Sequence, residues 1–220
     1  MKKVVLISIL LILFSNFNFS QQWTFLTDDN NAKAEYTLDE AKSNNKDLTI
    51  NFTLNAYRLK EITINNNVSY IVESPNGARI LKAGAPDLPL YAQSVIIPDT
   101  GSMEVIINKV DFVEIQKIDI APSKGNLLRT VNPDSVPYSF GSEYQQNSFF
   151  PTDIVYLRDP YILRDFRGQA IVVQPFQYNP VTKTLRIYTN IDFTVRATQG
   201  SGINEFHRNK ALQSIDREFN

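Results

Sequence analysis

The stretch that decides the fold is QYNPVTKTLRIYTNIDFTV, residues 177–195. After its Asn-Pro pair, apolar and polar side chains alternate from Leu185 to Val195. Because successive side chains of a strand point to opposite faces, this period of two predicts a half-buried β-strand. Together with the apolar run at residues 169–176, it predicts a long antiparallel hairpin that turns at Asn179-Pro180.

The same alternation recurs upstream, in residues 48–54, 62–72, 103–107 and 115–120. Three asparagines interrupt the second of these segments, and asparagine tolerates positive φ, so a hairpin is predicted there. Helical spacing appears only in the final stretch, which carries Phe206, Leu212, Ile215 and Phe219. Many short strands separated by turn signals predict an all-β fold: an antiparallel β-sandwich or flattened barrel with a long inserted loop and a short C-terminal helix.

The first residues predict export. A short cationic start precedes an apolar run at residues 4–14, interrupted only by Ser8. The run is too short to span a bilayer core of ~30 Å and is typical of a secretory signal peptide. We expect a signal peptide at 1–20, a flexible lead-in at 21–46, a β-rich domain at 47–197 and a linker or helix at 198–220. The protein is then located in the periplasm, at the cell surface or outside a bacterium, without membrane association once the signal is removed.

The composition excludes several functional classes. The chain has 220 residues, no cysteine and one histidine, His207, so a Cys–His dyad and a His-based metal cluster are ruled out. A Ser–His–Asp triad would depend wholly on His207. With 22 Lys+Arg against 23 Asp+Glu, there is no basic field to attract nucleic acid. We expect a chain that is not an enzyme and needs no metal or cofactor; carboxylates alone could serve glycoside hydrolysis, but no pair of them is brought together in the sequence.

Residues 121–153 do not fit a plain sandwich. They show weak periodicity and combine prolines and glycines with Tyr138, Phe140, Tyr144 and the Phe149-Phe150 pair. A connection of this length inside a compact domain is usually functional or disordered, and its aromatic content argues against disorder. The loop is therefore expected either to pack on its own domain or to face a partner.

Five strings of the sequence resemble the proregion of gingipain-type cysteine peptidases. They are GAPDLPLYAQSVIIP (84–98), IAPSKGNLLRTVNPDSVPYSFG (120–141), FFP (149–151), DPYILRDFRGQ (159–169) and QYNPVTKTLRIYTNI (177–191). Each is weak alone, but their order and spacing are specific. The resemblance implies a non-catalytic domain that covers the active-site cleft of its cognate peptidase, keeps the enzyme latent and assists its folding. It also implies that residues 198–220 lead towards a catalytic domain, unless the proregion-like domain is encoded alone.

The resemblance further implies which loop residues matter. Gingipain-type peptidases cleave after Arg or Lys, so a basic residue on an extended segment of the loop is the expected filler of the specificity pocket. Lys124 and Arg129 are the basic candidates. If the pocket-filling position instead follows the FFP string, the residue there is Thr152 or Asp153, and neither is basic.

Other interpretations stay open. The chain could be a free-standing exported β-sandwich module that binds protein or carbohydrate, with Tyr138, Phe140 and Tyr144 as stacking platforms. The charge-rich string at 158–167 is expected to form ion pairs and turn caps, or else a contact surface. Arg208 and Arg217 are expected processing sites near the end of the sequence.

Overall fold

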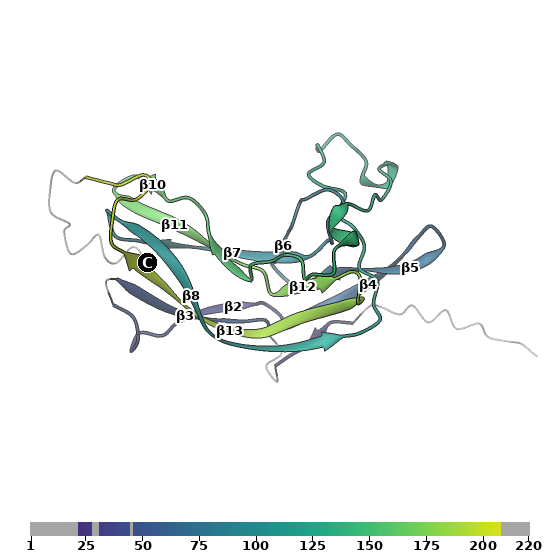
Figure 1. The fold of residues 1–220 in the computed structure, drawn as a ribbon, viewed down its shortest axis with the longest axis horizontal. Helices are drawn as coiled ribbons and strands as arrows, with labels where there is room; N and C mark the ends of the chain where they lie inside the picture. The colour runs from purple at the N-terminus through teal and green to yellow at the C-terminus, as the bar shows by residue number, and fades with distance from the viewer. Residues whose placement is uncertain (1–21, 28–30, 45, 208–220) are drawn as a thin grey trace, which may run out of the picture.

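The computed structural model describes residues 22–27, 31–44 and 46–207, which form antiparallel sheets and almost no helix (Figure 1). The signal peptide expected at 1–20 lies outside the described residues, as does most of the stretch expected to end in a helix. Of the described residues of this stretch, Thr198 ends a strand and residues 199–207 form bends, a turn and irregular backbone instead of a helix. Within the described ranges, no helix is long and apolar enough to cross a membrane.

Two five-stranded sheets pack against each other, and a three-stranded sheet lies at one end of the molecule (Figure 1). The first sheet contains β10 (Tyr161–Leu163), β11 (Phe166–Val173), β7 (Pro89–Ile96) and β6 (Ala78–Arg79), with β9 (Val155–Leu157) also paired to β11. The second contains β12 (Phe176–Asn179), β13 (Thr184–Thr198), β3 (Asp47–Thr53), β2 (Glu35–Leu38) and β8 (Ser102–Ile115). The third contains β1 (Thr24–Phe25), β4 (Ala56–Ile64) and β5 (Asn67–Glu73). The sheets do not close into a barrel, so of the two predicted all-β architectures the sandwich is confirmed.

Strand β13 organises the second sheet. It pairs with β8 along its length and with β3 on its other edge. Its alternating apolar side chains, such as Ile187 and Phe193, are fully buried, which confirms the period-two prediction. Two register shifts, one between Tyr188 and Asn190 and one between Asp192 and Phe193, interrupt the ladder with β8. Such bulges increase the local twist of the strand pair.

The predicted C-terminal hairpin is only half right. Strand β12 does pair with β13, across a turn in which Asn179 Oδ1 accepts hydrogen bonds from the amides of Val181 and Thr182. Strand β11, however, pairs with β7 and β9 in the opposite sheet. The chain changes sheets next to Pro175, a residue that cannot donate to a ladder. Period-two alternation identified both strands but not the sheet to which each belongs.

The asparagine-rich hairpin is confirmed. Strands β4 and β5 pair from Arg58 to Ile64, and the turn residues Asn65 and Asn66 have φ of 49° and 65°. Positive φ at both central positions is what a tight hairpin turn requires, and asparagine tolerates it better than most residues. The hairpin projects from the end of the molecule, beside the 121–153 loop (Figure 1).

Part of the segment expected as a flexible lead-in belongs to the sheets. Strand β1 pairs with β4, and β2 pairs with β3. The guanidinium of Arg58 lies 4.6 Å from the ring centroid of Trp23, a cation–π contact that fixes the first strand further. The domain boundaries at residues 46 and 197 stay predictions, but two short strands precede the first of them.

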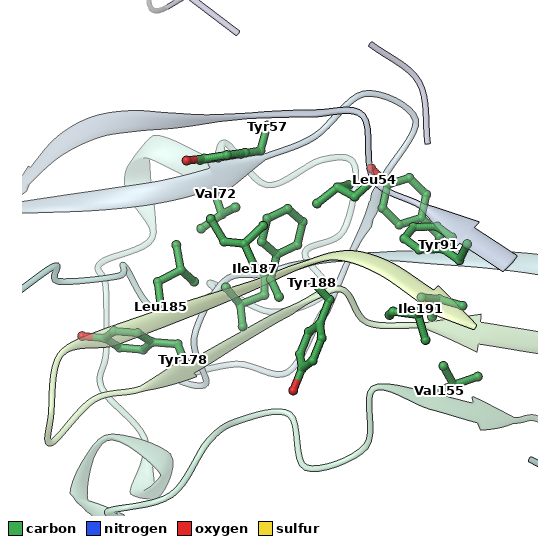
Figure 2. Packing of buried hydrophobic residues seen from close by; sticks show 14 of the residues in the cluster. Leu54, Tyr57, Val72, Tyr91, Val155, Tyr178, Leu185, Ile187, Tyr188 and Ile191 are labelled. Atoms are coloured by element: carbon green, nitrogen blue, oxygen red, sulfur yellow. The ribbon is translucent and has the colours of Figure 1, made fainter. Parts of the chain in front are cut away.

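The core lies between the sheets and draws side chains from all three of them. Figure 2 shows Leu185 and Ile187 of β13 gathered in one cluster with Leu54 and Val72. Burial of each large apolar side chain stabilises the folded state by about 1.5–3 kcal/mol. A core of this kind stabilises the domain without disulfides, and the chain has no cysteine to form them. Tyr178 is buried with its Oη donating to the carbonyl of Ile118 at 2.9 Å, and burial raises its pKa to about 12.

Candidate functional site

The loop at residues 121–153 leaves the domain through an outgoing arm, residues 121–125, which is hydrogen-bonded to the domain. The amide of Ser123 donates to the carbonyl of Ala85 at 2.7 Å, and the carbonyl of Ser123 accepts from the amide of Gly84 at 2.9 Å. Gly84 has a φ of +80°, and a Cβ there would lie 3.0 Å from the amide nitrogen of Gly141. Glycine is therefore required where the two halves of the loop meet the body.

The returning arm is fixed to β12. Phe150 and Tyr178 exchange two backbone hydrogen bonds, of 2.9 and 2.8 Å, as in an antiparallel bridge. The next peptide bond, Phe150-Pro151, is cis. The side-chain amide of Gln177 donates to the carbonyl of Pro151 at 2.7 Å. Both ends of the loop are thus bonded to the sandwich.

Between the two arms lies a cluster that supports the loop and that we call the brace; it consists of Lys82, Phe140, Glu143 and Tyr144. The hydroxyl of Tyr144 donates to the carbonyl of Ile120 at 2.8 Å, and its ring meets Phe140 edge to face at 4.7 Å. Burial raises the pKa of Tyr144. Lys82 and Glu143 form an ion pair of 2.5 Å, and the hydrogen bond from Lys82 lowers the pKa of Glu143. This part of the loop packs on its own domain, as one of the two alternatives predicted.

The middle of the loop, residues 126–137, projects from the body, and we call it the loop tip (Figure 1). The amide of Val131 donates to the carbonyl of Leu128 at 2.9 Å, which closes a turn. Leu128 is 74% exposed and Arg129 is exposed beside it. Within the part of the chain that the structure describes, the side chain of Arg129 has no hydrogen-bond, ion-pair or ring partner.

The loop tip is not the extended segment that was predicted. Arg129 and Thr130 occupy the centre of the turn, and a short 3-10 helix, η1 (Pro133–Ser135), comes directly after it. Asn132 caps this helix by accepting the amide of Asp134 at 3.0 Å. A second 3-10 helix, η2 (Ser142–Gln145), carries the brace. Local side-chain-to-backbone bonds of Asn, together with Pro at the first helical position, favour this compact form.

The other three predicted loop residues lie in different surroundings. The Nζ of Lys124 donates to a carbonyl of the loop tip at 2.7 Å and lies 4.3 Å from the ring centroid of Tyr138. Thr152 and Asp153 are exposed, but they come after the returning arm and lie at the body of the domain. Of the four candidates, only Arg129 lies in the turn of the loop tip.

A cavity of about 350 Å³ lies at the base of the loop. Its lining includes Phe140, Tyr144 and Tyr178, together with Asp119 and Lys183, whose charges are 2.9 Å apart. Asp119 is the one carboxylate among these lining residues, whereas glycoside hydrolysis uses two. Within the described residues, no group of three or more His, Cys, Asp or Glu is placed to hold a metal ion.

The role of Arg167 could not be recognised from the sequence pattern. In place of the ion pairs expected in the 158–167 string, its guanidinium is fully buried and bonded to four backbone carbonyls. The remaining charged residues of the string are exposed: Arg158, Asp159, Arg164 and Asp165. Strand β11 is buried on both faces, so it shows no alternation that would mark position 167 as buried. Charged residues are almost never fully buried, so the residue type alone favoured the surface.

A family model described as Propeptide_C25 matches residues 33–217. The chain belongs to this family. Gingipain R1 from Porphyromonas gingivalis is 35% identical over 219 residues, which cover all of this chain and 12% of that protein. Gingipain R2 from the same bacterium is 39% identical over 155 residues, covering 70% of this chain and 21% of the relative. The chain thus spans only a small part of these relatives.

Solved structures agree with the family. The structure described as the complex of Porphyromonas gingivalis RgpB pro- and mature domains is 36% identical, with a TM-score of 0.74, and the match covers 78% of this chain and 89% of that one. A structure on zymogenic latency of gingipain K has a TM-score of 0.64 and covers 81% of this chain and 99% of that one. At 17% identity, the second likeness concerns the fold alone. The family resemblance of the five sequence strings is confirmed.

Proposed function

We propose that this chain is the non-catalytic proregion of an exported gingipain-like cysteine peptidase. It covers the active-site cleft of the cognate catalytic domain, keeps the enzyme latent and assists its folding. Support comes from the family and from a solved relative in which a prodomain is present together with a mature domain. The processing sites Arg208 and Arg217 belong to this proposal, and both lie outside the described residues.

The observation that carries the proposal is a contrast within the loop: both arms are hydrogen-bonded to the domain, whereas the side chain of Arg129 at the loop tip has no partner among the described residues. Arg129 is a cation on a short turn, and the structure gives it no use within the described domain. A guanidinium presented in this way suits a pocket that takes basic side chains, where it forms charge-assisted hydrogen bonds. Fixed arms reduce the entropy lost when the loop is bound.

The turn also explains why the loop would inhibit and not be cleaved. Peptide substrates commonly bind as extended strands, through main-chain hydrogen bonds along a cleft. The Leu128–Val131 turn keeps Arg129 out of that extended conformation. Its side chain can enter the pocket while the following peptide bond stays out of attack geometry, and attack requires close alignment of the reacting atoms.

The structure weakens the other candidates for the pocket. Lys124 already bonds within the loop tip, and removing it from Tyr138 would sacrifice a cation–π contact. Asp153 carries the wrong charge for a pocket that takes Arg or Lys. The alternative of a carbohydrate-binding module also loses support, because the ring of Tyr144 packs against Phe140 and the ring of Tyr138 lies against Lys124.

The test is inhibition in trans. Residues 21–220 are purified and added to the cognate peptidase, and the inhibition constant is measured. We expect Arg129→Ala to raise it tenfold or more, since loss of a buried charge-assisted contact costs about 1.4 kcal/mol or more. Arg129→Lys separates a pocket that requires a planar guanidinium from one that needs only positive charge.

Arg158→Ala is the matched control, because Arg158 is also an exposed arginine but lies on the body. Its inhibition constant should equal that of the unmodified chain. If Arg129→Ala has no effect and Asp153→Ala weakens inhibition, the pocket is filled by the residue that follows the returning arm, and the assignment of Arg129 is wrong.

A further inference from the structure

Arg167 is the largest fully buried side chain of the described residues. Its Nη1 donates to the carbonyl of Pro98 at 2.8 Å, and its Nη2 donates to those of Gly101 and Ile203 at 2.8 and 2.7 Å. Its Nε donates to the carbonyl of Asn204 at 3.0 Å. Burying a cation is tolerated only when its donors are satisfied, so the four carbonyls are a condition for Arg167 to be inside.

The four carbonyls come from two segments that are distant in sequence. Two belong to the connection between β7 and β8, and two belong to residues 200–206, which come after β13 and which we call the latch. The side chain between them comes from β11. Figure 1 shows the chain after β13 running beside β10, at the end of the molecule opposite the loop tip.

Independent contacts hold the latch to the same connection. Oε1 of Glu205 accepts the amide of Gly101 in the connection at 2.9 Å, and also the amide of Gly202 within the latch at 2.7 Å. The amide of Phe206 donates to the carbonyl of Asp99 at 2.8 Å. A Cβ at Gly202 would overlap the carbonyl of Gly101, so the two segments approach as closely as backbone allows. These contacts make the latch a bonded part of the domain.

We propose that the latch couples the fold of the domain to the integrity of the chain just after β13. A cut on the domain side of the latch, between residues 199 and 200, disrupts the hydrogen bonds from Arg167 to the carbonyls of Ile203 and Asn204. A cut beyond residue 207 leaves these hydrogen bonds in place. The position of cleavage therefore decides whether the domain survives it.

The coupling arises from the loss of tethering. While the chain is intact, the latch is held next to Arg167 at high effective concentration, and a cut removes that advantage. Once the latch has left, Arg167 lacks acceptors from Ile203 and Asn204. A buried charged group without its partners is strongly destabilising. The domain then either exposes Arg167 or unfolds around it.

One consequence concerns latency and rests on the proposed function. Cleavage after Arg208 would separate the proregion from its catalytic domain and leave a folded inhibitor that still covers the cleft. Cleavage before the latch would separate the two domains and also destroy the inhibitor. Processing after Arg208 therefore preserves latency, and processing before the latch ends it.

The experiment uses residues 21–220 with a short recognition sequence for a site-specific protease inserted at one of two places. The first insertion lies between Gln199 and Gly200, both exposed, where a Cβ on Gly200 would meet open space. The second lies between His207 and Arg208. We expect cutting of the first protein to release residues 200–220 on gel filtration and to lower the thermal midpoint by about 6 °C or more. Cutting of the second should change the midpoint by less than about 2 °C.

Each cut protein is compared with its own uncut form, so any damage from the insertion itself cancels. If the first protein keeps its midpoint and retains the fragment after cutting, or if both cuts lower the midpoint equally, the coupling is refuted. Inhibition of the cognate peptidase is measured on the same samples. The first cut should abolish inhibition together with the midpoint, whereas Arg129→Ala should weaken inhibition at an unchanged midpoint. If no sample inhibits at all, the proposed function fails while the midpoints still decide on the latch.

Discussion

Two irregular segments at opposite ends of the molecule use the same side chain in opposite ways. In the loop tip, Arg129 is exposed and has no partner among the described residues. At the latch, Arg167 is fully buried and donates to four backbone carbonyls. A guanidinium that is buried and saturated serves the fold. One that is free on a fixed turn is available to another protein.

The comparison also shows why the loop tip can be free. Its arms are bonded to the body in the same manner as the latch, through backbone carbonyls and amides such as those of Ser123 and Phe150. Order in the arms reduces the entropy lost on binding, and the tip itself contributes the side chain. The loop therefore combines arms whose backbone groups are hydrogen-bonded to the domain with a tip on which Arg129 has no partner among the described residues.

The largest expected difference between the two arginines is in stability. Arg167→Met removes the donors of four carbonyls while keeping much of the side-chain volume, and we expect the free energy of unfolding to fall by about 3 kcal/mol or more. Arg129→Met is the matched substitution at the surface, and its effect should stay within about 0.5 kcal/mol. Urea denaturation of both proteins measures the difference.

Arg167→Lys adds a second measurement if the methionine variant does not fold. A lysine keeps the charge but cannot direct its donors towards four separate carbonyls, so its stability should fall between those of the methionine variant and the unmodified chain. Equal stability of the lysine variant and the unmodified chain would show that charge, and not the geometry of the hydrogen bonds, holds Arg167.

Much of the fold could be predicted from the sequence because alternation reports burial directly. Strand β13 and the β4–β5 hairpin were recognisable from Leu185 to Val195 and from the three asparagines. Pairing was harder, because β11 and β12 are consecutive apolar segments that look like one strand. Only tertiary packing shows that Pro175 separates strands of two different sheets.

The candidate site was partly predictable, and its gaps have a physical cause. The loop stood out by its length and aromatic content, and Arg129 stood out by its charge. The turn at Leu128 depends on a backbone hydrogen bond that no residue type marks. The burial of Arg167 depends on carbonyls from two distant segments, and a carbonyl is the same in every residue. Patterns of side chains report burial and turns well, but they do not report which backbone groups meet.

A smaller effect is expected at the brace, which lies between the two extremes. Tyr144→Phe removes the hydroxyl that donates to the carbonyl of Ile120, and we expect the free energy of unfolding to fall by about 1–2 kcal/mol. Tyr138→Phe is the matched control, because no hydrogen bond of the Tyr138 hydroxyl is found within the described residues, and its effect should be under about 0.5 kcal/mol. Denaturation curves of equal midpoint for the two variants would mean that the brace does not depend on this hydroxyl.

The smallest expected effect concerns pH and separates the two ends by the kind of partner that each carboxylate has. Hydrogen bonds from the amides of Gly101 and Gly202 lower the pKa of Glu205, and His207 and Arg167 add attraction. The hydrogen bond from Lys82 is the main cause that lowers the pKa of Glu143, and a hydrogen bond from its own backbone amide adds to it. In both cases the folded pKa lies below the unfolded value of about 4.3. The stabilisation is therefore present above that pH and is lost as the pH falls through the folded pKa.

Salt distinguishes the two carboxylates. The side chain of Lys82 is 60% exposed and that of Glu143 only 11%, so raising the salt to about 0.5 M screens this ion pair in part, whereas it has little effect on hydrogen bonds from neutral backbone amides. In low salt, Glu143→Gln and Glu205→Gln should both flatten the loss of stability between about pH 5 and about pH 3. In high salt, the effect of Glu143→Gln should shrink while that of Glu205→Gln should stay nearly unchanged, because the first two causes of the low pKa of Glu205 are backbone N–H groups and the first cause at Glu143 is Lys82. Denaturant midpoints recorded against pH at the two salt concentrations decide the matter. If salt reduces the Glu205 effect as much as the Glu143 effect, Glu205 is held by its charged neighbours and not by the backbone amides of Gly101 and Gly202.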